Sequence, residues 1–231
     1  MGDIRFRDYG RIVFFTGAGL SAESGIPTYR GRGGIWAKYD YEAYACQRAF
    51  DRDPHRVWDF HDVRRAFVAA CEPSEGHRIV AEVQRAKPET IVITQNIDGL
   101  HQRAGSKDVV ELHGSLWRVR CPHEGTVRPD LSVPMNPRTC ACGAVLRPDI
   151  VWFEDALDRE TVRRAEEALE RCDLLVSVGT SAVVYPAADL PQIAAARGAM
   201  TVEVNLEDTP MTGLYRERVR GKASDALRAM T

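Results

Sequence analysis

Residues 94–114, TQNIDGLHQRAGSKDVVELHG, carry the side chains best suited to chemistry in this sequence. Asn96, Asp98 and His113 place an amide, a carboxylate and an imidazole within one short segment. The segment begins and ends on apolar runs that are typical of strands. Ligands of parallel α/β sheets bind beyond the carboxyl ends of the strands. We therefore expect these three polar residues to line a ligand crevice.

Residues 13–30, VFFTGAGLSAESGIPTYR, predict a nucleotide-binding turn. An apolar run is followed by Gly17 and Gly19 and then by the start of a helix, and such glycines allow the backbone to approach a pyrophosphate closely. The motif alone also fits a glycine turn that holds no ligand. Asp40 has the spacing of a ribose-binding acid, but its surroundings do not resemble a strand. Plain hydride transfer is therefore disfavoured.

Short apolar runs alternate with longer amphipathic stretches along the chain. The expected strands are residues 12–15, 91–94, 108–112, 174–179 and 201–205. The expected helices are residues 76–86, 158–172 and 187–198. Strands that are apolar throughout and alternate with helices indicate an α/β fold with a doubly wound, Rossmann-like parallel sheet.

Two stretches interrupt this alternation and predict a smaller inserted domain. Residues 30–72 are aromatic and partly helical in pattern, and residues 117–148 are rich in Pro, Arg and Cys. The larger, nucleotide-binding domain would consist of residues 1–29, 73–116 and 149–231.

The composition excludes several classes of partner. The 31 basic and 33 acidic residues give a net charge of −2, so nothing suggests binding to nucleic acid. No apolar run approaches the roughly 18 residues of a membrane span, and the charged N-terminus does not resemble a signal peptide. We expect a cytoplasmic protein without a membrane partner. Disulfides are rare in that compartment, so the clustered Cys121, Cys140 and Cys142 suggest a metal site.

Six motifs occur in one order and at compatible distances: GAGLSAESGIPTYR, TQNIDGLH, ELHGSL, LRPDIVWF, VGTS and VEVN. Together they resemble the sirtuins, the NAD-dependent protein-lysine deacylases, in their short bacterial form. The resemblance implies a Rossmann-type NAD domain with a smaller domain that contains a helical module and a zinc ribbon. It also implies that acyl-lysine proteins react with NAD to give free lysine, nicotinamide and 2′-O-acyl-ADP-ribose.

The resemblance assigns a role to each polar residue of the first segment. His113 matches the catalytic general base, and an imidazole whose ordinary pKa is about 6.5 suits that task at neutral pH. Asn96 and Asp98 match the catalytic nicotinamide end of the site. The NAD contacts implied by resemblance are Gly17, Ala18, Gly19, Tyr29, Arg30, Gln95, Asn96, Ile97, Asp98, Gly179, Thr180, Ser181, Asn205, Leu206, Glu207 and Ala223.

The acyl-lysine contacts implied by resemblance are His61, Arg64, Val151, Trp152 and Phe153. Desuccinylating sirtuins have a Tyr-x-x-Arg pair, whereas this chain has His61 and Arg64, and Arg32 replaces a small alanine. We expect short neutral acyl groups such as acetyl. Arg64 leaves removal of succinyl or malonyl groups open, because a guanidinium can pair with their carboxylate.

The metal site departs from the two Cys-x-x-Cys pairs of the family. Glu124 stands at one cysteine position, so Cys121, His123, Cys140 and Cys142 are the candidate ligands. These residue types fit a Cys3His zinc site, but the one-residue spacing in both pairs is tighter than usual. Zinc-bound and zinc-free forms of this lobe both remain open.

Two other functions use the same motifs. An NAD glycohydrolase or mono-ADP-ribosyltransferase would transfer the sugar to water or to another acceptor. A non-catalytic, NAD-responsive binding module is the third alternative, and the presence of His113, Asn96 and Asp98 argues against it.

Overall fold

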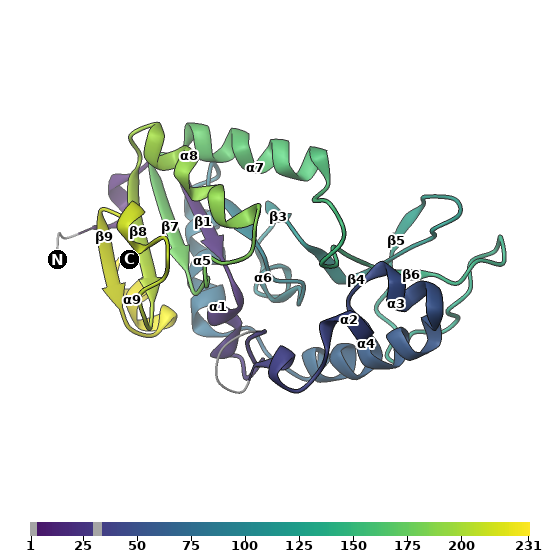
Figure 1. Ribbon diagram of the computed structural model, residues 1–231. Coiled ribbons are helices and arrows are strands. Elements are labelled where there is room, and N and C mark those ends of the chain that lie inside the picture. The colour runs from purple at the N-terminus through teal and green to yellow at the C-terminus, as the bar shows by residue number, and fades with distance from the viewer. Residues whose placement is uncertain (1–3, 30–33) are drawn as a thin grey trace.

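A six-stranded parallel sheet forms the larger part of the molecule in the computed structural model, which describes residues 4–29 and 34–231 (Figure 1). Its strands are β1 (Ile12–Thr16), β2 (Ile91–Thr94), β3 (Val109–Glu111), β7 (Leu174–Val178), β8 (Met200–Asn205) and β9 (Glu217–Arg220). Their order is β3-β2-β1-β7-β8-β9. Every residue of β1 and β7 is buried, which explains why the central strands are apolar throughout.

Helices cover both faces of this sheet and create two separate apolar cores. On one face α5 (Glu75–Ala86) and α9 (Ala223–Ala229) pack against the strands. On the other face lie α7 (Arg159–Arg171) and α8 (Pro191–Ala196), which run along the top of the view in Figure 1. The short helices α1 (Ala18–Ala22) and α6 (Leu100–Arg103) follow β1 and β2. Four short 3-10 segments are η1 (Phe6–Asp8), η2 (Ile35–Ala37), η3 (Ala187–Asp189) and η4 (Thr212–Leu214).

A second, antiparallel sheet and three helices form a smaller lobe on the right in Figure 1. The sheet contains β4 (Gly114–Arg120), β5 (Val127–Pro129) and β6 (Arg147–Ile150), in the order β5-β4-β6. The helices are α2 (Tyr41–Tyr44), α3 (Gln47–Arg52) and α4 (Pro54–Ala69). They share a third core with the sheet, which includes Trp58 of α4 and strand residues such as Leu116. The predicted fold class, a doubly wound parallel sheet with a smaller inserted lobe, is confirmed.

The sequence analysis missed the edge strand β9 and the small sheet. β9 is the charged segment ERVR, and its residues alternate between half-buried and exposed because it pairs on one side only. No apolar run marks it. Across the described ranges, residues 4–29 and 34–231, every helix is too short or too polar to cross a membrane.

A buried arginine joins the helices of the small lobe to its sheet. Arg65 of α4 is 1% exposed and donates hydrogen bonds to the carbonyl oxygens of Leu116, Asp130 and Ser132. Its guanidinium also pairs with the Asp130 carboxylate at 2.8 Å. One planar side chain therefore satisfies backbone acceptors that neither the helix nor the sheet could satisfy alone.

Replacing Arg65 with Ala should lower the free energy of unfolding by about 3–5 kcal/mol, because Asp130 and three carbonyls lose a buried partner. The measurement is chemical denaturation followed by circular dichroism. Arg163→Ala is the matched control, since Arg163 is paired with Glu160 and Glu167 on an exposed helix face, and such pairs contribute less than about 1 kcal/mol. Equal losses in the two variants would contradict this role of Arg65.

Candidate active site

A cavity of about 1100 Å³ opens beyond the carboxyl ends of the parallel strands. The strand order reverses direction between β1 and β7, and such a switch point opens a crevice because the following segments diverge. Residues of the small lobe form the opposite wall of the cavity. The cavity therefore lies between the two sheets, where a long ligand and a second substrate can meet.

The turns after β1 and β7 touch at the switch point. The Gly19 N–H donates to the Gly179 carbonyl at 2.8 Å. A Cβ atom on Gly19 would lie 2.7 Å from the Gly179 Cα atom, and Gly179 has a φ of +61°. Side chains at either position would separate the two turns. The glycines are thus required by the protein's own backbone as well as by any phosphate.

Asn96 and Asp98 follow β2 and are held by short hydrogen bonds. The Asn96 amide donates to the Gly17 carbonyl at 3.0 Å and to Ser21 Oγ at 3.1 Å. Ser21 in turn donates to the Asp98 carboxylate at 2.7 Å, and the Leu100 N–H donates to its other oxygen. Burial raises the pKa of Asp98, while these two hydrogen bonds oppose the rise. Ser21 was missed by the sequence analysis, although its place one turn after the glycines was a usable signal.

His113 follows β3 and lies on the cavity wall. Its Nδ1 lies 2.9 Å from the Gln95 carbonyl oxygen, so Nδ1 is the protonated nitrogen of the neutral ring. The basic nitrogen of that tautomer is Nε2. His101, by contrast, is 1% exposed and contacts Thr16 Oγ1 inside the fold, as expected for a structural histidine.

The small lobe supplies an aromatic end to the cavity. Arg64 of α4 donates to the Tyr29 hydroxyl at 3.2 Å, and its guanidinium lies 5.0 Å from the centre of that ring. His61 is 4% exposed, and burial, together with the charge of Arg64, lowers its pKa to about 3. After β6, the Val151 N–H donates to the His113 carbonyl at 2.9 Å. This hydrogen bond holds the segment that begins at Val151, which lines the cavity, next to His113.

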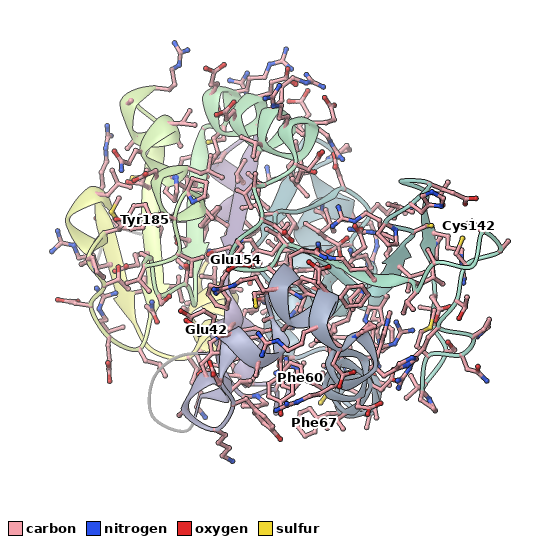
Figure 2. The ribbon with its side chains drawn as sticks, turned by 45° about the vertical axis from the view of Figure 1, so that its right-hand side comes forward. Glu42, Phe60, Phe67, Cys142, Glu154 and Tyr185 are labelled. Atoms are coloured by element: carbon pink, nitrogen blue, oxygen red, sulfur yellow. The ribbon has the colours of Figure 1, made fainter. Side chains whose placement is uncertain are left out.

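The structure brings nearly all of the predicted site residues to this one cavity. Asp98 lies behind Asn96 and does not line it, and Arg30 and Arg32 lie outside the described residues. Lining residues that the sequence analysis did not select include Trp36, Phe60 and Tyr185. These are aromatic residues without a polar motif around them, so only the folded arrangement identifies them. Figure 2 shows Phe60 on the helical wall and Tyr185 on the opposite side.

A buried carboxylate organises the loop at the far end of the cavity. Glu203 of β8 is 1% exposed and accepts hydrogen bonds from Thr209 and Thr212 at 2.8 and 2.7 Å. Arg220 of β9 pairs with the same carboxylate at 2.7 Å. Residues 206–210 of this loop line the cavity beside Asn205. Glu203 therefore sets the position of that wall.

Four potential metal ligands gather at the edge of the small lobe. One ligand atom each from Cys121, Glu124, Cys140 and Cys142 lies within 4.8 Å of the other three. Glu124 is in this group and the predicted His123 is not, because the turn after Cys121 brings Glu124 beside the sulfurs. Figure 2 shows Cys142 at the outer edge of this lobe.

The chemistry of this cluster fits a zinc ion. The Cys121 and Cys142 sulfurs are 3.5 Å apart, close to the roughly 3.7 Å expected for two thiolates on one tetrahedral zinc. The Glu124 N–H donates to Cys121 Sγ and lowers the pKa of that thiol, which favours the thiolate that binds metal.

Comparisons with known proteins agree over most of the chain. The model of the Sir2 family matches residues 17–186. An NAD-dependent protein deacylase of Aquifex aeolicus is 46% identical over 220 residues, which cover 94% of this chain and 92% of the relative. A protein of the same name from Mycobacterium tuberculosis is 45% identical over 225 residues, with 94% of both chains covered.

Solved structures show the same likeness in three dimensions. A Sir2 homologue in complex with ADP-ribose has a TM-score of 0.93 and 41% identity, with 97% of this chain and 92% of that chain covered. A Sir2 homologue in complex with NAD has a TM-score of 0.91 and 41% identity, with 97% and 89% covered. Since motifs, sheet order, cavity and comparisons agree, the chain belongs to the Sir2 family.

Proposed function

We propose that this protein removes short acyl groups from protein lysines and consumes NAD, giving nicotinamide and 2′-O-acyl-ADP-ribose. One observation carries the proposal: a single cavity joins the glycine turns, Asn96, His113 and the aromatic end. The relatives named NAD-dependent protein deacylase and the homologue bound to NAD support it.

Different residues of the cavity bind different parts of NAD. NAD supplies a sugar carbon that is electrophilic once nicotinamide leaves. Gly17, Gly19 and Gly179 offer close backbone approach to its phosphates, and Asn205 and the following loop hold its adenosine. Asn96 faces the nicotinamide end, and Asp98 positions it through Ser21, which donates to the Asp98 carboxylate and accepts from the Asn96 amide.

His113 acts as the general base on a ribose hydroxyl. The Gln95 carbonyl keeps the proton of its neutral ring on Nδ1, so Nε2 is the nitrogen that accepts a proton. Because the Val151 N–H binds the His113 carbonyl, the acyl-lysine wall and the base keep a fixed relation. We propose that Val151, Trp152 and Phe153 pair with the substrate backbone by strand addition.

We also propose the boundaries of the two domains and the location of the protein in the cell. We take residues 1–29, 73–116 and 149–231 as the NAD-binding domain, and residues 30–72 and 117–148 as the smaller domain. A cytoplasmic location is supported by the six cysteines, which are all free thiols.

His113→Ala should lower kcat/KM for an acetyl-lysine peptide by at least about 10³-fold, because the variant loses the Nε2 atom that accepts the ribose proton. Nicotinamide release and peptide mass spectrometry measure the reaction, and calorimetry should show that NAD still binds. His55→Ala, on an exposed turn of α4, is the control. Nicotinamide release by the wild type without acyl peptide would favour a glycohydrolase instead.

Glu203→Gln should raise KM for NAD about fivefold and leave kcat at saturating NAD within about twofold, because the adenosine loop loses its charged anchor while the reacting end is untouched. ADP-ribose affinity should fall in parallel, and KM for the acyl peptide should not change. Glu166→Gln, on the exposed face of α7, is the matched control. A lower kcat with an unchanged KM for NAD would contradict this assignment.

Zinc held by Cys121, Glu124, Cys140 and Cys142 would fix the edge of the small lobe and take no part in the reaction. Purified protein should contain about one zinc per chain, and a chelator should lower Tm by at least about 5 °C. Cys140→Ser should reduce the zinc content, whereas the control Cys71→Ser should retain it. A zinc content near zero that added zinc does not restore would exclude a metal at this site.

A further inference from the structure

Two residues of the small sheet hold the loop that carries Asp98. This loop, residues 95–99, connects β2 to α6 and has no regular secondary structure. The Leu116 N–H donates to the Ile97 carbonyl at 2.9 Å. The indole Nε1–H of Trp117 donates to the Asp98 carbonyl at 2.7 Å. Both donors belong to β4, so the small sheet satisfies two backbone carbonyls of a loop that follows the parallel sheet.

The Trp117 ring also lies directly against Gly99. Gly99 has a φ of +72°, and a Cβ atom on it would lie 2.7 Å from Trp117 Cδ1 and 3.0 Å from Trp117 Nε1. Only a residue without a side chain lets the indole approach this closely. The ring therefore contacts the loop through the same edge that carries its N–H group.

Arg65 fixes the position of this indole. The Arg65 guanidinium lies 5.3 Å from the centre of the Trp117 ring and donates to the Leu116 carbonyl at 2.9 Å. The same guanidinium is held by Asp130 and Ser132. Because Trp117 is held within its own lobe, its hydrogen bond positions the loop that accepts it.

Trp58 provides a contrast, since its indole bonds only within the small lobe. Trp58 of α4 is fully buried, and its Nε1–H donates to the carbonyl of Leu146, which directly precedes β6. The Trp117 hydrogen bond instead reaches the loop that follows β2. There the Asp98 carboxylate accepts from Ser21, so the bond connects the small lobe to the polar groups of the site.

We propose that Trp117 is a positioning residue for the nicotinamide end of the site, through which the small lobe sets the place of Asp98. The inference rests on the proposed deacylase function, which assigns Asn96, and Asp98 through Ser21, to nicotinamide. Trp117 is not among the residues that line the cavity, so it acts through the loop. Its loss should therefore weaken interactions with nicotinamide and leave those with adenosine and peptide unchanged.

Trp117→Phe tests the proposal, because phenylalanine keeps an aromatic ring beside Gly99 and Arg65 and removes the N–H group. The concentration of nicotinamide that halves deacylation of an acetyl-lysine peptide should rise about fivefold, since a hydrogen bond that holds the loop is lost. KM for the peptide and Kd for ADP-ribose, which lacks nicotinamide, should stay within about twofold.

Trp58→Phe is the matched control, because it removes an indole hydrogen bond to a carbonyl of the same lobe. It should lower Tm and leave inhibition by nicotinamide unchanged. A merely structural role of Trp117 would make the two variants alike.

A second measurement uses the wild-type protein alone. Addition of nicotinamide to the complex with ADP-ribose should slow hydrogen–deuterium exchange in residues 96–100 and also in residues 114–118, whose Leu116 amide donates to the loop. Residues 47–52 of α3 lie in the same lobe and should exchange at an unchanged rate.

The outcomes separate the inference from the function beneath it. Inhibition by nicotinamide that is unchanged in Trp117→Phe would overturn the inference, and so would an equal effect of Trp58→Phe or an equal loss of ADP-ribose affinity. Unchanged exchange in residues 114–118 would also overturn it, whether or not the variants fold. If the wild type releases no nicotinamide with any acyl peptide, the deacylase function fails, and the exchange measurement still decides the role of Trp117.

Discussion

The arrangement of the whole site depends on the close contact between the turns that follow β1 and β7. Gly19 and Gly179 approach so closely that a Cβ on either would meet the backbone of the other turn. This contact lies where the order of the parallel strands reverses, and it sets how far the crevice opens. Asn96 is then fixed relative to β1, because its amide donates to the carbonyl of Gly17, which directly follows that strand.

The two lobes are joined next to His113, so the position of this residue depends on how the two lobes meet. Gly114 begins β4 with a φ of +77°, and a Cβ there would overlap the Asp149 carbonyl oxygen. The chain can therefore turn from the parallel sheet into the small sheet only through a residue without a side chain. As a result, His113, the start of β4 and the segment after β6 form one junction.

Buried polar groups define the chemistry of the rest of the cavity. Some are fully satisfied, such as Glu203, which holds the loop after β8, and Arg65, which joins the helices of the small lobe to its sheet. His61 Nε2 differs, because it is buried and has no hydrogen-bond partner among the described residues. The satisfied groups therefore hold these parts of the structure in place.

The sequence alone determined the parallel sheet, the glycine turns and the polar residues after β2 and β3. It could do so because buried central strands are apolar throughout and because the motifs are local in the chain. It could not show β9, whose charged residues pair at a sheet edge, or the fourth metal candidate, which depends on how the turn after Cys121 places Glu124. Only the tertiary structure decided that Ser21 joins Asn96 to Asp98 and that His61 Nε2 is buried without a hydrogen-bond partner among the described residues. These hydrogen bonds and this burial depend on contacts between segments that are distant in the sequence. They are therefore fixed only when those segments pack together.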